Sequence, residues 1–389
     1  MNANLTSIER IEALKDRRVF ITGNTGFTGS WLSLWLYLLG AKVVGYALDA
    51  PTKPNLFETL NLRRKILSIH GSVLDFNSLN HAIKKHEPEI IFHLAAMPIV
   101  RESYKYPRLT YETNVMGAVN LLECVRSSNS VRSVVIVTSE KCYKIDTCRE
   151  SFSEDAPIGE HDPYSSSKAC VEILTNSWAF SFFSTTGKNT QRIGTGTARP
   201  SNIIGGGDWS VDRLIPDCIK ACNAGSPIFV RNPMHHRPWQ YVFNPLYGYL
   251  LLASFLLDDP VAFSSGFNFG APRKDLWSVE SVVKKIIQTW GNGEYQVDKN
   301  NNHPYEEKSL FMECNKAKSM LNWEPLFDLT EGIAETVSWY RNFYNCSSNK
   351  KIEKYSQLCI EAAMVRILSH SERFRSPILR QHCQLGLSE

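Results

Sequence analysis

The sequence predicts an α/β fold, in which a doubly wound parallel sheet is joined to a smaller, partly interleaved C-terminal domain. Short apolar runs in the first part of the chain alternate with longer segments of helical spacing. The runs lack regular polar positions, which is typical of strands buried on both faces of a parallel sheet. After about residue 200, glycine-rich and proline-punctuated loops with short helices replace this alternation, which indicates a second structural part.

The elements of the first part can be placed in order along the chain. Strands are predicted at 17–23, 41–49, 65–72, 89–96 and 131–139. Helices are predicted at 31–39, 78–86 and 108–126. Strands that alternate with helices in this way favour a doubly wound sheet.

Length and composition indicate the number of domains and exclude several classes of protein. The chain has 389 residues, 43% of them hydrophobic and 21% charged, which suits domains at 1–198 and 199–344 and a C-terminal helical extension at 345–389. A formal charge of +4 gives no reason to expect nucleic acid. No apolar run is long enough to cross a membrane, and the N-terminus lacks a signal core, so a cytoplasmic location is expected. The ten cysteines form no CxxC pair and the histidines no HExxH motif, so reduced thiols and no metal are expected.

The segment GNTGFTG lies between the first predicted strand and the first predicted helix. It places Gly23, Gly26 and Gly29 where a pyrophosphate must approach the backbone, and where a Cβ would obstruct it. The following helix N-terminus offers free N–H groups and a partial positive charge. The pattern predicts a dinucleotide site of the Rossmann type. Asp49 follows the second strand where a ribose-binding carboxylate is expected and favours NAD over NADP, with a solvated surface side chain as the alternative.

A second constellation could carry proton transfer. Tyr164 and Lys168 in YSSSK lie one above the other on a helix face. An ammonium group stabilises a phenolate, so the tyrosine could act as a general base toward a hydroxyl while hydride leaves to the cofactor. Ser139, at the end of the fifth predicted strand, could hydrogen-bond the same hydroxyl, and it is followed by Glu140 and Lys141.

With these motifs, the segments HLAA (93–96) and TNVMGAVNLLE (113–123) resemble the extended short-chain dehydrogenase/reductase superfamily. Other segments narrow the resemblance to the family of CDP-glucose 4,6-dehydratases, from about Arg17 to Trp339: GNTGFTGSWLSLWL, GYALDAPT, TSEKCY, DPYSSSKA, NIIGGGDW, DRLIPD and RPWQYV. The resemblance implies a tightly held NAD and a CDP-sugar substrate in deoxysugar biosynthesis. Oxidation at C4 would be followed by loss of water across C5 and C6 and by return of hydride to C6. It also implies a homodimer, or a dimer-based oligomer, through the helices at about 100–125 and 164–185.

The residues after Ser139 are where this chain departs from the family. Related nucleotide-sugar dehydratases carry Asp-Glu there and the CDP-glucose enzymes carry Asp-Lys, whereas this chain has Glu140 and Lys141. Glu140 retains the carboxylic acid that would protonate the C6 hydroxyl. Its reach is longer by roughly 1.5 Å, a change that can matter for rate.

The resemblance also implies the remaining site residues. Cofactor contacts are expected from Gly23, Thr25, Gly26, Phe27, Gly29, Asp49, Ser72, Val73, Leu94, Ala95, Ala96, Tyr164 and Lys168. Substrate contacts are expected from Arg199, Asn202, Arg213 and Arg237, with a structural salt bridge as the alternative for any single arginine. Ser72 stands where the family commonly has Asp, and Met97 where it often has Gln. The segment NNHPYEE, with His303, Tyr305 and Glu306, resembles a loop near the nucleotide.

Two alternatives remain open. A nucleotide-sugar 4-epimerase or 4-dehydrogenase needs the serine, tyrosine and lysine but no acid for C6. A non-catalytic NAD-binding scaffold needs neither Tyr164 nor Lys168. In the extension, a linker at 345–351 is expected, followed by an amphipathic helix with Ile352, Tyr355, Cys359 and Ala362 on one face, together with Leu358 and Val365.

Overall fold

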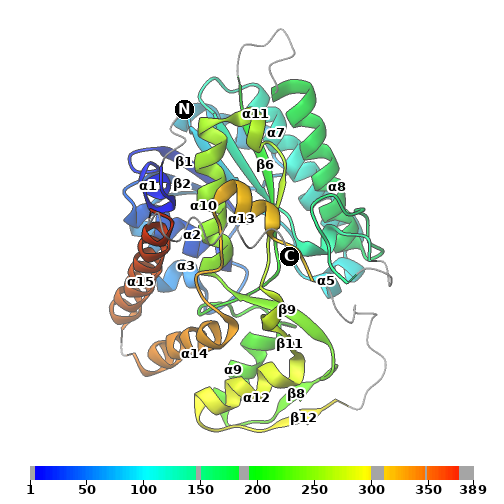
Figure 1. Ribbon diagram of the computed structural model, residues 1–389, viewed down its shortest axis with the longest axis vertical. Helices are drawn as coiled ribbons and strands as arrows, with labels where there is room; N and C mark the ends of the chain where they lie inside the picture. Colours follow the sequence, from blue (N-terminus) through cyan, green and yellow to red (C-terminus); the bar gives the residue numbers. More distant parts are fainter. Residues whose placement is uncertain (1–4, 146–149, 184–191, 299–310, 347, 376–389) are drawn as a thin grey trace.

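A seven-stranded parallel sheet forms the centre of the computed structural model, which describes residues 5–145, 150–183, 192–298, 311–346 and 348–375 (Figure 1). The strand order is β10-β6-β5-β4-β1-β2-β3. This order confirms the predicted doubly wound, Rossmann-type fold. The strands are β1 (Arg18–Thr22), β2 (Lys42–Ala47), β3 (Leu67–His70), β4 (Ile90–His93), β5 (Ser133–Val137), β6 (Gly194–Pro200) and β10 (Gly266–Phe269).

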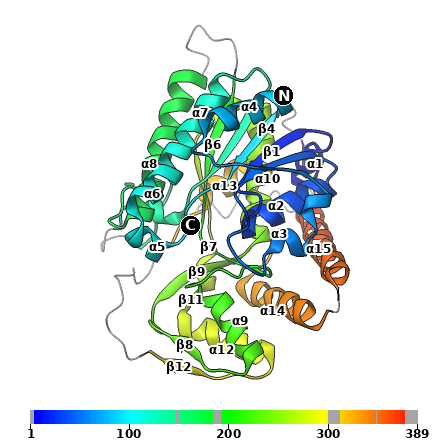
Figure 2. The ribbon, with the colours of Figure 1, turned by 180° about the vertical axis from the view of Figure 1, so that it is seen from behind.

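Helices cover both faces of this sheet (Figure 2). Along β1, Val19 and Ile21 belong to the core shared with α2 (Phe27–Leu38) and α10 (Phe243–Asp258). Phe20 belongs to the opposite core, which is shared with α4 (Phe76–His86), α7 (Gly117–Arg126) and α8 (Pro163–Trp178). Because the strands are buried on both faces, their sequences are continuous apolar runs.

The five predicted strands and three predicted helices of the first part are confirmed, with one refinement. The segment expected as one helix at 108–126 consists of α6 (Pro107–Tyr111), a π-helical turn at Glu112–Met116 and α7. Such π-helical turns often occur at functional sites. This one contains Asn114, whose side chain is buried.

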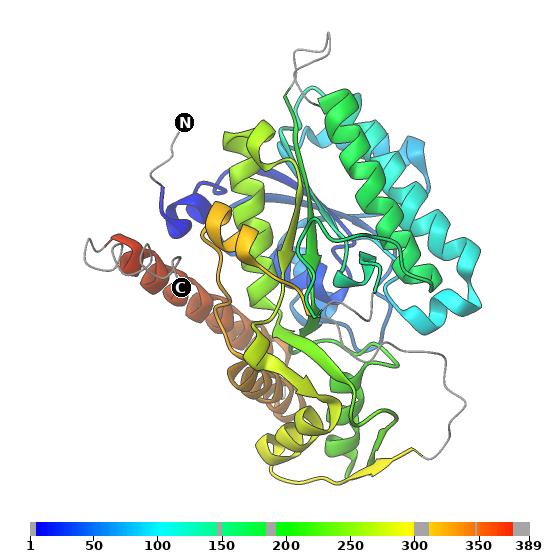
Figure 3. The same cartoon turned by 45° about the vertical axis from the view of Figure 1, so that its right-hand side comes forward.

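The second part of the chain forms two small sheets beside the main one (Figure 3). One contains β7 (Asn202–Ile204), β9 (His236–Tyr241) and β11 (Leu276–Ser278), and the other pairs β8 (Ile228–Val230) with β12 (Tyr295–Val297). Because α10 packs on the main sheet and β10 joins it, the two parts are interleaved. The expected boundary at residue 198 stays a prediction.

The remaining elements connect or flank these layers. No helix in the described ranges is both long and apolar enough to cross a membrane. The other helices are α1 (Ser7–Glu12), α3 (Leu56–Thr59), η1 (Leu62–Arg64), α5 (Val100–Lys105), η3 (Glu140–Cys142), η4 (Ala179–Phe183), α9 (Leu214–Ala224), α11 (Pro260–Phe263), η5 (Arg273–Asp275), α12 (Val279–Trp290), α13 (Asn315–Leu321) and α14 (Leu329–Asn345).

The C-terminal extension is the long helix α15 (Asn349–Arg375), which packs against α1, α2, α3 and α14. It starts inside the stretch expected to be a linker. The predicted amphipathic helix is confirmed, but its buried face differs from the predicted one. Ala362, Leu358 and Val365, which follow the predicted helical spacing, are exposed. The buried positions are Ile352, Ser356, Cys359, Ile360, Ala363 and Ile367. A hydrogen bond contributes to this orientation of the helix: Ser356 Oγ accepts from the Trp339 indole N–H at 2.9 Å.

Candidate active site

A cavity of about 650 Å³ lies between the C-terminal ends of the main strands and the second part of the chain. All five predicted catalytic residues line it: Ser139, Glu140, Lys141, Tyr164 and Lys168. Three of the four predicted substrate residues also line it: Asn202, Arg213 and Arg237. The cavity therefore brings together residues far apart in sequence, because parallel strands end at the same edge of a sheet.

Ser139, Glu140 and Lys141 form a tight turn directly after β5. Ser139 caps the short helix η3, and its Oγ accepts a hydrogen bond of 3.2 Å from the Lys141 backbone N–H. The same hydroxyl donates to Glu140 Oε2 at 2.9 Å. The turn thus presents the serine hydroxyl and the glutamate carboxyl next to one another, with the glutamate only 5% exposed.

Tyr164 and Lys168 face this turn from the first turns of α8. Asp162 caps that helix by accepting a hydrogen bond of 2.9 Å from Ser165 N–H, and Pro163 occupies a first-turn position that needs no N–H donor. Lys168 Nζ donates to the Val137 carbonyl at 3.0 Å and lies 6.0 Å from the Tyr164 ring centroid. Tyr164 and Lys168 lie on one helix, as their spacing predicts, and both line the cavity, whereas their catalytic roles stay predictions.

Burial controls how these groups ionise. It raises the pKa of Glu140 above its usual value, although the Lys141 ammonium and the Ser139 hydrogen bond partly oppose this. It also raises the pKa of Tyr164, and a Glu140 carboxylate would raise it further. Burial lowers the pKa of Lys168 to about 8, with Glu172 acting in the opposite direction. A protonated Glu140 therefore makes a Tyr164 phenolate easier to form, so the two acids are coupled.

The glycine turn has the geometry that a dinucleotide site requires. Gly23 has φ +74°, and a Cβ on Gly29 would lie 2.2 Å from the Gly23 carbonyl oxygen. Gly26 is the N-cap residue of α2, and no side chain makes a capping hydrogen bond there. The helix N-terminus is thus left without a side-chain acceptor, as a phosphate site needs.

Other predicted cofactor residues surround this turn. Thr25 Oγ1 donates to the Leu48 carbonyl at 2.9 Å, which ties the turn to the chain just before Asp49. The Asp49 side chain is 90% exposed. This exposure is compatible both with a contact to a ribose and with a solvated surface carboxylate. Leu94 and Ala96 line the cavity, and the Ala95 N–H donates to Thr22 Oγ1 at 3.3 Å.

The predicted adenine-side contacts remain predictions. The Ser72 carbonyl accepts a hydrogen bond of 3.2 Å from the Tyr46 hydroxyl. Val73 is buried, and a Cβ on Gly117 would lie 2.6 Å from its Cγ2. Phe27 packs against the core as a partly buried residue.

The second part contributes two cationic side chains to the cavity. Arg213 pairs with Asp208 at 3.0 Å, and Arg237 donates to the His236 carbonyl at 3.1 Å. Both remain predictions as substrate contacts. The segment with His303, Tyr305 and Glu306 lies outside the described residues.

For Arg199, the structure favours the alternative of a structural salt bridge over a contact with substrate. Its side chain is 8% exposed, it forms an ion pair of 2.8 Å with Glu172, and it does not line the cavity. The neighbouring motif residue Asn202 does reach the cavity. Arg199 belongs to β6, where successive side chains point to opposite faces, so closeness in sequence to Asn202 does not place both at the ligand.

Asn114 was not predicted as a site residue. Its amide accepts from the Met97 N–H at 2.8 Å and donates to Ser167 Oγ at 2.8 Å, so it fastens the loop after β4 to α8. The segment TNVMG belongs to the sequence resemblance, but no spacing within it singles out the side chain of Asn114. The π-helical turn that directs Asn114 inward is a feature of the folded backbone.

Comparison with known proteins places this architecture among nucleotide-sugar enzymes. The family model described as GDP-mannose 4,6 dehydratase matches residues 20–336. CDP-glucose 4,6-dehydratase of Salmonella typhimurium is 44% identical over 325 residues, covering 84% of this chain and 90% of the relative.

Solved structures show the same fold at lower identity. UDP-glucose 4-epimerase of Thermotoga maritima, solved with UDP-glucose, aligns with a TM-score of 0.71 at 22% identity, covering 84% of this chain and 99% of that one. The dTDP-glucose 4,6-dehydratase of Bacillus anthracis, solved in complex with NAD, aligns with a TM-score of 0.68 at 22% identity, covering 83% and 96%.

The glycine turn yields a test of dinucleotide binding. In Gly23→Ala, a Cβ would lie 2.7 Å from the Ala95 backbone nitrogen, so the turn must move and the stabilisation by added NAD in a thermal-unfolding assay should be lost. Gly225→Ala is the matched control, because Gly225 also has positive φ (+65°) but nothing lies within 4 Å of its Cβ position. Equal NAD-induced shifts in both variants would contradict the assignment.

Proposed function

This chain belongs to the GDP-mannose 4,6-dehydratase family, and from that premise we propose that it is an NAD-dependent enzyme that converts CDP-glucose to CDP-4-dehydro-6-deoxyglucose. One observation carries the proposal. A buried carboxyl group with raised pKa, Glu140, lies in the same cavity as Ser139, Tyr164 and Lys168. Oxidation at C4 needs the last three residues, and only elimination needs the acid. The 44% identical relative supports CDP-glucose as the substrate.

The residues around the glycine turn fit NAD. The uncapped N-terminus of α2 would hold the pyrophosphate, and Asp49 would accept hydrogen bonds from the adenosine ribose. Leu94 and Ala96 would border the cofactor on the way to Tyr164 and Lys168. When bound, NAD supplies a reversible acceptor for the hydride of C4.

The first proton transfer is assigned to Tyr164. Its phenolate would take the proton of the C4 hydroxyl, while Ser139 holds that hydroxyl by a hydrogen bond. The Lys168 ammonium lowers the free energy of the phenolate by its charge. A lysine pKa of about 8 leaves this cation mostly present at neutral pH.

The elimination is assigned to the turn after β5. The keto group at C4 acidifies the C5 proton, and Glu140 would donate a proton to the C6 hydroxyl as it leaves as water. A carboxyl with raised pKa keeps that proton nearer to neutral pH than an exposed glutamate does. Lys141, the next residue of the turn and part of the same cavity lining, is the candidate base for the C5 proton.

Assembly, location and pathway form part of the same proposal. Apolar side chains remain exposed along the helices at 100–126 and 163–183, as a helix-mediated homodimer requires: Tyr104, Leu109, Met116, Ile173, Phe180 and Phe182. A cytoplasmic enzyme of deoxysugar biosynthesis, including that of O-antigens, would have access to NAD and nucleotide sugars. The eight cysteines within the described residues are free thiols, which is compatible with that compartment.

Product analysis tests the proposed reaction. Purified protein incubated separately with CDP-, dTDP-, UDP- and GDP-glucose should convert the CDP-sugar to a 4-keto-6-deoxy product, detected by mass spectrometry and NMR as the loss of one water. A C4 epimer, or net accumulation of NADH, would instead identify an epimerase or a dehydrogenase. Complete inactivity with NAD still bound would identify a scaffold.

Glu140→Gln tests the assignment of the acid. An amide cannot donate the carboxyl proton, so elimination should slow by about 100-fold or more while C4 oxidation continues. The reaction should then stall with trapped NADH, visible as absorbance at the reduced nicotinamide band. Glu140→Asp restores the residue typical of the family and should retain turnover. Unchanged turnover of Glu140→Gln would remove this residue from the mechanism.

A further inference from the structure

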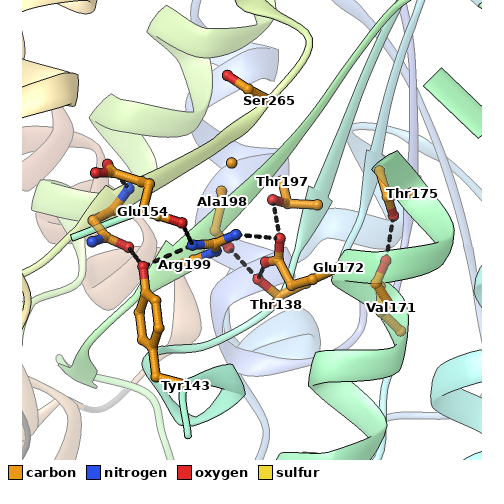
Figure 4. Close-up of polar contacts among 12 residues, drawn as sticks. Thr138, Tyr143, Glu154, Val171, Glu172, Thr175, Thr197, Ala198, Arg199 and Ser265 are labelled. Atoms are coloured by element: carbon orange, nitrogen blue, oxygen red, sulfur yellow. Dashed lines mark hydrogen bonds and ion pairs between the residues drawn. The ribbon is translucent and has the colours of Figure 1, made fainter. Parts of the chain in front are cut away.

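Two charged side chains that do not line the cavity form a second polar group, which is hydrogen-bonded to the cavity-lining residue Thr138 (Figure 4). Its centre is the ion pair between Glu172 on α8 and Arg199 on β6, with side chains 4% and 8% exposed. One carboxylate oxygen, Oε2, accepts from Arg199 Nη2 at 2.8 Å and from Thr197 Oγ1 at 2.6 Å. The other, Oε1, accepts from the Thr138 hydroxyl. The mechanism assigns no step to any of these residues.

This group holds both ends of the catalytic turn. Thr138 immediately precedes Ser139 and is bound to the Glu172 carboxylate. Tyr143 immediately follows η3, and its hydroxyl accepts a hydrogen bond of 2.7 Å from Arg199 Nη1. That hydroxyl also donates to Asn268 Oδ1 at 2.7 Å. The segment that carries Ser139, Glu140 and Lys141 is thus attached at its start and at its end to one ion pair.

The ion pair also connects the turn to the helix that faces it. Glu172 lies one helical turn after Lys168 on α8, and its charge raises the pKa of that lysine against the effect of burial. Lys168 Nζ in turn donates to the carbonyl of Val137, which precedes Thr138. The proton-transfer helix and the elimination turn therefore share one buried anchor.

Stability alone is a weak reason for placing these charges in the interior. Desolvating two ions offsets most of their attraction, and well-packed apolar side chains often stabilise such a site equally well. Hydrogen bonds to charged groups are, in contrast, directional and strong. A buried pair with three directional contacts to the turn and its neighbouring strand suits a requirement for fixed geometry.

We propose that Glu172, together with Arg199, is a positioning residue that sets the turn at Thr138–Tyr143 against the face of α8, and so sets the distance from Glu140 to the reacting sugar. This inference deepens the proposed function and rests on it for its catalytic consequence. A fixed turn matters for the rate, because an acid displaced by about 1 Å from its productive position loses rate steeply.

The first readout is independent of activity. Hydrogen exchange of the peptide covering 139–143, followed by mass spectrometry on the NAD-bound protein, reports opening of the turn. Thr138→Val and Tyr143→Phe each remove one contact to the ion pair and should speed exchange there by about tenfold. Glu172→Gln should do so more strongly, but it leaves Arg199 without its counter-charge and so is interpreted only alongside the milder variants.

Matched variants separate positioning from general stability. Thr175 is as buried as Thr138, both 3% exposed, and its hydroxyl donates only to the Val171 carbonyl of the same helix. Thr175→Val should leave exchange at 139–143 as in the wild type. Thr138→Ser, which keeps the hydroxyl, should do the same. Wild-type exchange in both Thr138→Val and Tyr143→Phe, or equal loosening by Thr175→Val, would overturn the proposal.

The second readout is the partition between oxidation and elimination. In a single turnover with CDP-glucose, Thr138→Val and Tyr143→Phe should accumulate transient NADH and slow elimination on the order of tenfold, with C4 oxidation nearly unchanged. Normal partition despite a loosened turn would overturn the catalytic role. If the wild type makes no 4-keto-6-deoxy product from CDP-glucose, the proposed reaction fails, whereas the exchange experiment still decides whether the ion pair positions the turn.

Discussion

The central sheet is buried on both faces, and most other features of the site depend on that constraint. Helices α2 and α10 cover one face and α4, α7 and α8 the other, so side chains in the strand interiors are mainly apolar. Polar groups that must meet a ligand are confined to the ends of the strands. Because the strands are parallel, those ends lie at one edge, where the loops after β1, β4 and β5 and the chain after β6 converge. The second part of the chain closes the cavity from the opposite side.

Burial then gives the ionisable groups at this edge their properties. Glu140, Tyr164 and Lys168 are all nearly excluded from water, and each is shifted toward its neutral form. The shifts depend on one another, since a charged Glu140 disfavours the phenolate and a charged Glu172 favours the ammonium. Oxidation and elimination need a phenolate beside an ammonium and a carboxyl that still carries its proton. The coupling between Glu140 and Tyr164 favours that combination of protonation states.

The sequence predicts the parts of this arrangement that depend on local spacing. The glycine turn and the pair Tyr164 and Lys168 are separated by a few residues, so strand–turn–helix geometry and helix periodicity place them. For Arg199 the sequence leaves a substrate contact and a structural salt bridge open, because a motif next to a strand end does not reveal which side chain enters the cavity and which pairs with a buried charge. The orientation of Asn114 depends on a π-helical turn, and the buried face of α15 depends on the partners it meets. Both are set by contacts between distant segments, which residue spacing does not contain.

The central claim is that hydride removed from C4 returns to C6 of the sugar while Glu140 releases water. The most direct measurement follows deuterium from C4-deuterated CDP-glucose through a complete turnover. The account predicts a 4-keto-6-deoxy product with deuterium at C6 and no net change in the oxidation state of NAD. Deuterium that remains at C4 of an epimerised sugar, or that accumulates in reduced cofactor, would contradict it.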